Sequence, residues 1–167
     1  MQSKPDIRIF AAGVTDAPAI AQLLGKQASQ TSTAVIATGG SDKVVPQTAD
    51  IELLLRRERS GVLLAQVDGT NAGLIGYTVD GTIVRLFGIS VPARSSGSIA
   101  NGEVAQRLIA AAEETARALG MSLVATQAVR PGFDFDAFVA AGYVVDCEEP
   151  EAAGGGVITV ADLIKLL

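Results

Sequence analysis

The spacing of apolar residues changes several times along the first third of the chain, and each change marks a new element. Apolar and polar residues alternate over 6–13, which predicts a strand. Apolar positions at helical spacing over 15–27 and 48–61 predict two helices, the second closed by Gly61. The segment 28–50 between their apolar runs is rich in Ser, Thr and Gly. A loop of that length inside a compact domain is usually functional or mobile.

The middle of the chain holds apolar runs of strand length separated by turn residues. The runs cover 61–69, 71–79 and 81–91, and Asp68-Gly69 and Asp80-Gly81 lie between them. Asp-Gly between two apolar runs is a strong hairpin signal, because glycine readily adopts the positive φ that tight hairpin turns require. The sequence therefore predicts an antiparallel meander.

A long amphipathic helix is expected before Gly120, which ends it. The strand 121–129 follows. Because the helix is a crossover connection, this strand is predicted to run parallel to the one that ends near Val91. A short helix over 133–142 and a strand over 143–151 come next. The inward stripe of the long helix is predicted to comprise Val104, Ala105, Leu108, Ile109, Ala112 and Leu119.

The tail of the chain leaves two interpretations open. A turn is expected over 152–156 and a strand over 157–160, whereas 161–167 fits a strand or a helix equally well. There is no internal repeat and no separable linker, so the predicted order is β-α-α-β-β-β-α-β-α-β-β. This order describes one α+β domain over residues 1–167, with a mostly antiparallel sheet flanked by helices.

The composition of the chain argues against several kinds of partner and several kinds of active site. The net charge of −5 and the lack of a Lys/Arg run make nucleic acid and anionic membrane surfaces poor partners. No signal peptide and no membrane span is expected, and the single cysteine, Cys147, suits a cytoplasmic protein. A chain without histidine cannot form a Ser-His-Asp triad, a Cys-His dyad or the usual zinc site.

The segment from Gly88 to Gly120 has an arrangement that proteins often use to bind anions: a strand, a loop of small and polar residues, and a helix N-terminus. Arg94 adds positive potential to that loop. Neither a Gly-Lys-Ser/Thr nor a G-x-G-x-x-G sequence occurs, which argues against nucleotide triphosphate and dinucleotide loops. The alternative is an exposed connection capped by Asn101, with Glu103 as an ordinary first-turn acid.

With this loop, the chain resembles the GCN5-related N-acetyltransferase (GNAT) superfamily from about residue 7 to residue 167. The resemblance lies in the element order, in Arg94-Ser95-Ser96-Gly97 and in the sequence AAGY at the end of the short helix. The family's loop reads Arg/Gln-x-x-Gly-x-Gly/Ala. Here Ile99 stands at the last small position, and the segment 98–103 lengthens the loop.

The resemblance implies a cosubstrate, acetyl-CoA or another acyl-CoA, and no metal. In the family, the acyl-CoA enters a splay between the fourth and fifth strands, here 82–91 and 121–129. Backbone groups at the end of the fourth strand hold the pantetheine arm, and the N–H groups of the loop hold the pyrophosphate. The implied binding residues are Ile89, Ser90, Val91, Arg94, Ser95, Ser96, Gly97 and Ser98.

The acid and the base that the family often uses have no counterpart here. The position of the acidic Tyr on the short helix is Phe138, and the fourth strand has Arg85 as its one charge in place of a Glu. Tyr77, on the third strand beside the expected cleft, is assigned as the catalytic hydroxyl. Asp134 and Asp136 are further candidates, although acids at a helix start favour the helix dipole in any case.

Two classes of function follow from the resemblance. The first is an acyl-CoA-dependent N-acyltransferase that acetylates an amine of a small molecule or a peptide by direct attack on the thioester. Positioning of the two substrates contributes much of the rate enhancement in such an enzyme. The second is a non-catalytic domain of the same fold, used for ligand sensing or protein association. A homodimer is compatible with both, because many members of the family pair.

Overall fold

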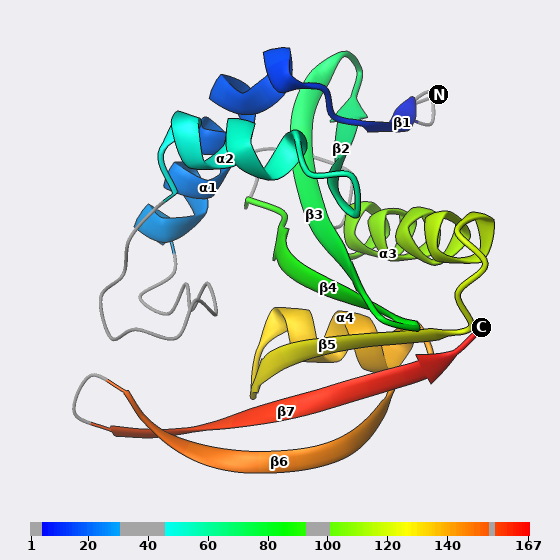
Figure 1. Cartoon of the computed structure of the whole chain (residues 1–167). Helices are drawn as coiled ribbons and strands as arrows, with labels where there is room; N and C mark the ends of the chain where they lie inside the picture. Colours follow the sequence, from blue (N-terminus) through cyan, green and yellow to red (C-terminus); the bar gives the residue numbers. More distant parts are fainter. Residues whose placement is uncertain (1–4, 31–45, 93–100, 154–155) are drawn as a thin grey trace.

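The structure is a computed structural model, and it describes residues 5–30, 46–92, 101–153 and 156–167. A seven-stranded sheet with the order β1-β2-β3-β4-β5-β7-β6 forms its centre (Figure 1). Neighbouring strands run antiparallel except for β4 and β5, which run parallel. The α+β class, the element order and the single parallel pair predicted from the sequence are confirmed.

The bounds of the elements follow the predicted order. The strands are β1 (Ile7–Ala11), β2 (Ser60–Val67), β3 (Thr70–Asp80), β4 (Ile83–Ser90), β5 (Leu123–Arg130), β6 (Val144–Ala153) and β7 (Gly156–Leu166). The helices are α1 (Ala17–Gln30), α2 (Thr48–Leu55), α3 (Asn101–Ala118) and α4 (Phe133–Ala140), and a 3-10 turn, Val14–Asp16, precedes α1.

Both Asp-Gly turns of the meander are confirmed. Asp68 and Gly69 have φ values of 49° and 77°, so both residues are in the left-handed region, as a two-residue hairpin turn of the mirror-image type requires. Gly81 has a φ of 60° and joins β3 to β4. These short turns fix the order β2-β3-β4 within the sheet.

Helices cover the two faces of the sheet unequally. Successive residues of a strand point to opposite faces, and β2 shows this directly. Val62 and Leu64 join a smaller core under α1 and α2, whereas Leu63 and Ala65 join the larger core under α3 and α4. The larger core extends across β4, β5 and β7 to Leu163. In Figure 1, α1 and α2 lie near β2 and β3, away from the β7–β6 edge.

The prediction that Gly61 closes the second helix is wrong. α2 ends at Leu55, and Gly61 lies in β2 opposite Tyr77. A Cβ at Gly61 would lie within 2.8 Å of the Tyr77 ring. A glycine is needed at position 61 because the Tyr77 ring lies over its backbone; the end of a helix is not the reason.

The tail and the end of the long helix also differ from two expectations. Residues 161–167 are not helical: β7 pairs with β5 on one side and with β6 on the other, and both ladders fix it as a strand. Leu119 is 46% exposed, because α3 ends at Ala118 and the chain turns away, and the buried Ala116 completes the stripe instead. The turn expected over 152–156 is wrong at both ends, since Ala152 and Gly156 belong to strands.

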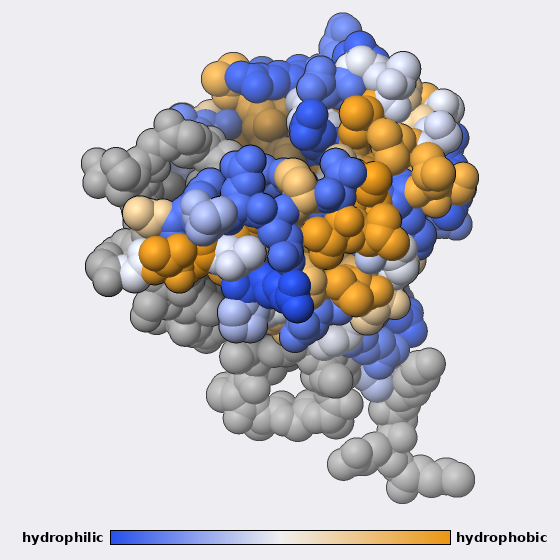
Figure 2. Space-filling model, turned by 90° about the horizontal axis from the view of Figure 1, so that it is seen from below, coloured by the Kyte–Doolittle hydropathy of each residue, from blue (hydrophilic) through white to orange (hydrophobic). Residues whose placement is uncertain are grey.

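The β6–β7 edge of the sheet exposes several apolar side chains. Val144 is 60% exposed and Leu166 is 78% exposed. Figure 2, seen from the β6–β7 side, shows apolar patches among the polar residues on this face. Within the described ranges, no helix combines the length and the apolar character that crossing a membrane requires.

Candidate functional site

β4 and β5 separate partway along their length. Their parallel pairing joins residues 83–86 to residues 123–126 and ends there, although both strands continue. At the last pair, the buried Thr126 hydroxyl donates a hydrogen bond to the carbonyl oxygen of Leu86 at 3.1 Å. Figure 1 shows β4 and β5 spreading apart toward their carboxyl ends. We call this opening the β4–β5 splay.

β4 has an irregular backbone beyond the narrow end of the splay. Gly88 has a φ of +59°, and the pairing of β4 with β3 shifts between Leu74 and Gly76. Ser90, at the end of β4, is 0% exposed, and its hydroxyl finds no hydrogen-bond partner in the part of the chain that the structure describes. An unpaired buried hydroxyl costs about 1–3 kcal/mol, so such a group needs an explanation, and a polar ligand is one.

Replacing Gly88 with Val is expected to destabilise the protein by about 1–2 kcal/mol, because residues with a Cβ are strained at positive φ. A Cβ at Gly88 meets no atom within 4 Å, so the cost arises from the backbone and not from a clash. Gly25→Ala in α1, where a Cβ also meets nothing within 4 Å, is the matched control and should be neutral or stabilising. Urea unfolding measures both, and unchanged stability of Gly88→Val would show that β4 does not need this conformation.

α4 begins just after β5 ends, so its first turn lies at the open end of the splay (Figure 1). Phe138 is 1% exposed and packs edge-on against the buried Tyr143, with ring centroids 5.0 Å apart. The Gln106 amide of α3 donates to the carbonyl oxygen of Ala137 at 2.7 Å and ties α4 to α3. The position that the resemblance gives to the general acid thus holds a core ring without a proton to donate.

Asp134 differs from its neighbour Asp136. Side chains four residues apart lie on the same face of a helix, which places Asp134 on the face of Phe138, one turn closer to the helix start. Asp134 is half-buried and Asp136 is exposed. Burial raises the pKa of the Asp134 carboxyl to about 6. The sequence did not separate the two acids, although the four-residue spacing from Phe138 is a signal that would have done so.

Tyr77 lies on the α3/α4 face of β3 and packs against the larger core. Its hydroxyl lies over Gly61, 2.7 Å from where a Cβ of that residue would be. β2 and β4 flank β3 on opposite sides, so the hydroxyl lies on the side of β3 away from the splay. The catalytic role of Tyr77 stays a prediction, and this placement favours a packing role.

The predicted acyl-CoA residues fall into two groups. Ile89, Ser90 and Val91 are at the end of β4 beside the splay, the first two buried and Val91 half-buried. Arg94 and the Ser95, Ser96, Gly97 and Ser98 positions lie outside the described residues. Glu103 lies in the first turn of α3 and pairs with Arg107 at 3.1 Å, so a neighbouring cation offsets its charge.

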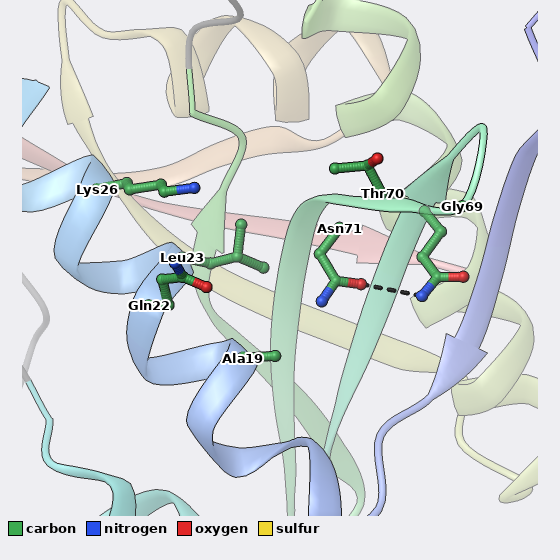
Figure 3. A pocket seen from close by; sticks show the side chains of 8 residues that line it. Ala19, Gln22, Leu23, Lys26, Gly69, Thr70 and Asn71 are labelled. Carbon is green, nitrogen blue, oxygen red and sulfur yellow. Dashed lines mark hydrogen bonds between the residues drawn. The ribbon is translucent and has the colours of Figure 1, made fainter.

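A separate hollow of about 290 Å³ lies between α1 and the β2–β3 turn (Figure 3). Its lining is mostly polar, and the Gln66 amide donates to the Asn71 side-chain oxygen at 3.1 Å. None of the predicted acyl-CoA residues is among the side chains drawn around it. Across the described ranges, no group of three or more His, Cys, Asp and Glu side chains is arranged to hold a metal ion.

Comparison with known proteins gives a clear answer for the fold. No family model and no curated protein matches the chain. Among solved structures, the GNAT-family acetyltransferase of Streptococcus pneumoniae superposes with a TM-score of 0.76 at 21% identity, over 97% of this chain and 99% of that one. The ribosomal-protein-alanine N-acetyltransferase of Brucella melitensis gives 0.76 at 16%, over 96% and 99%.

A third solved structure, yncA from Salmonella typhimurium with its cofactor acetyl-CoA, superposes with a TM-score of 0.72 at 15% identity, over 96% of this chain and 93% of that one. These likenesses span almost the whole chain, but at such low identity they concern the fold. The chain therefore has the GNAT fold, as the sequence predicts.

Proposed function

We propose that this protein is an acyl-CoA-dependent N-acyltransferase that transfers an acetyl group to an amine of a small molecule or a peptide. The observation that carries the proposal is the β4–β5 splay in a GNAT fold, with the Ser90 hydroxyl buried at the end of β4 and without a hydrogen-bond partner among the described residues. A neighbour of the same fold is crystallised with acetyl-CoA, which supports the choice of donor.

Each part of the splay has a task in this proposal. The Thr126–Leu86 hydrogen bond fixes the narrow end. Residues 89–91 lie where the amide-rich arm of the donor would run, and the Ser90 hydroxyl would bond to a polar group of that arm. Arg94 and the N–H groups of residues 95–98 follow directly in the chain and would meet the pyrophosphate. Bound in this way, acetyl-CoA supplies a thioester with a thiol leaving group.

Acetyl-CoA is expected to bind the wild-type protein, and Arg94→Ala to weaken binding about 10- to 100-fold. The reason is the loss of a charge-assisted hydrogen bond, worth about 1.5–3 kcal/mol. Glu103→Gln should strengthen binding by a few-fold, since it leaves the Arg107 cation, which Glu103 offsets in the wild type, free to attract the phosphates. Isothermal titration calorimetry measures all three, with the exposed Arg8→Ala on β1 as the matched control.

Activity is tested with acetyl-CoA and a panel of amines, followed by release of free coenzyme A. Because one neighbour of the same fold is a ribosomal-protein-alanine N-acetyltransferase, the panel includes a peptide that begins with alanine, beside a peptide that begins with serine and a small primary amine. Turnover with any of these supports the proposal. Equal affinity of Arg94→Ala and wild type would exclude the loop from the site.

The second candidate is a non-catalytic module of the same fold for ligand sensing or protein association. The buried Phe138 ring at the position of the family's acid favours it. Failure of the wild-type protein to bind acetyl-CoA would make it the better account. The cytoplasmic location and the homodimer expected from the sequence stay predictions under both candidates.

A further inference from the structure

Acyl transfer from a thioester to an amine moves one proton. The amine nitrogen loses a proton as it becomes an amide, and the thiolate gains one as it becomes a thiol. A positioned acid or base accelerates such a step about 10²- to 10⁴-fold. Phe138 cannot take part, and the Tyr77 hydroxyl lies over Gly61, away from the splay. The reaction of the proposed function therefore lacks its usual proton donors.

Asp134 has the position that such a group needs. β4 and β5 are parallel, so their carboxyl ends lie on the same side of the sheet, and the splay opens there. α4 starts at that end of β5, and Asp134 lies in its first turn. Asp134 shares the inward face of α4 with Phe138, one turn nearer to the open end. A carboxyl is thus placed next to the vacant acid position.

The surroundings of Asp134 leave its proton exchangeable. Burial is the cause that raises its pKa to about 6, while Asp136 beside it is exposed. Most charged groups on the elements packed against α4 pair with groups other than Asp134, although the Arg130 guanidinium also lies over the Phe135 ring of α4, 5.2 Å from its centroid. The pairs are Arg130 with Glu148, Glu103 with Arg107, and Glu113 with Lys165 and Arg117. Glu114 on α3 is exposed. A carboxyl held this way is ionised at pH 7.5 and remains a good proton acceptor and donor near neutral pH.

We propose that Asp134 is the proton relay of this acyltransferase, an inference that rests on the proposed function. The amine nitrogen attacks the thioester carbonyl carbon, a C–N bond forms and the C–S bond breaks. The proton released from nitrogen goes to the Asp134 carboxylate. The resulting carboxylic acid then gives it to the thiolate sulfur, so the carboxylate is restored and no other reactant is consumed.

The test compares wild type with Asp134→Asn, and uses Asp136→Asn as the matched control. Asp134→Asn should lower kcat at least tenfold with a little-changed Kd for acetyl-CoA, and Asp136→Asn should leave both unchanged. In wild type, kcat/KM should fall on the acid side as Asp134 is protonated near pH 6, and this limb should be lost in Asp134→Asn. Carbon-13 NMR of the free protein should show the Asp134 carboxyl titrating near pH 6.

The outcomes separate the relay from the proposed function. If wild type acetylates an amine and Asp134→Asn keeps more than a third of its kcat, the relay is wrong and the function stands. A carboxyl that titrates near pH 4 in the free protein also overturns the relay. If wild type binds acetyl-CoA but acetylates no amine of the panel, the proposed function fails and the relay with it.

Discussion

Replacing Lys165 with Met is expected to destabilise the protein by about 3–5 kcal/mol, because it leaves a buried carboxylate without its main partner. The Lys165 ammonium donates to both carboxylate oxygens of Glu113, at 2.9 and 3.0 Å, and to the carbonyl oxygen of Ala141 at 2.6 Å. The Glu113 side chain is 8% exposed, and Arg117 stays 3.8 Å away on the solvent side. The melting temperature should fall by roughly 6–20 °C.

Two further variants show whether the loss of stability in Lys165→Met comes from the unpaired charge of Glu113. The double variant Lys165→Met, Glu113→Leu should recover much of the loss, since a well-packed apolar pair often replaces a buried ion pair at little cost. Arg8→Met breaks the Arg8–Asp6 pair, whose side chains are largely exposed, and should change stability by less than about 1 kcal/mol. A loss in Lys165→Met as small as that in Arg8→Met would contradict the prediction.

Cys147 is expected to react with iodoacetamide at pH 8 about 10- to 100-fold more slowly in the folded protein than in urea. A hydrogen bond from its thiol to Asp162, 3.0 Å from Sγ to Oδ2, raises the pKa of Cys147 from 9.0 to about 11. The thiolate is the reacting form, so this shift lowers the reactive fraction about a hundredfold at pH 8. The greater nucleophilicity of a more basic thiolate recovers up to about tenfold.

Changing the Asp162 carboxylate tests whether its hydrogen bond slows the alkylation of Cys147. Its second oxygen accepts a hydrogen bond from the Gln127 amide at 2.8 Å, and the hydrogen bond from Cys147 lowers the pKa of Asp162. Asp162→Asn should therefore raise the alkylation rate of the folded protein, whereas Asp146→Asn, which removes a weaker nearby charge, should raise it much less. Mass spectrometry follows the reaction, and equal rates in the folded and unfolded protein would overturn the account.

Local signals in the sequence were enough for the sheet order at the centre of the fold. The dipeptides Asp68-Gly69 and Asp80-Gly81 favour tight turns by their own backbone preferences, so they specify the meander without help from distant residues. The long helix before Gly120 requires a crossover, and this makes the next strand parallel to β4. The resemblance located the splay between the same two strands.

Non-local pairing decided where local signals were ambiguous. Residues 161–167 suit a helix or a strand, and 161–166 became part of β7 because β5 and β6 lie on both sides of that strand and satisfy its backbone groups. Gly61 looked like the end of a helix, but the Tyr77 ring across the sheet accounts for it. Helix ends and strand choices of this kind depend on partners that a short window of sequence does not contain.

The chemistry of the candidate site divides in the same way. The sequence by itself excluded histidine chemistry, because that conclusion depends on residue identity alone. The resemblance to the GNAT superfamily added that Phe138 stands at the position of the family's acid. The tertiary structure distinguished Asp134 from Asp136 and left the Ser90 hydroxyl buried without a partner in the described chain. It also joined Glu113 to Lys165, which lie 52 residues apart in the sequence. Burial and distant contacts set these properties, and both arise when the strands and helices pack together.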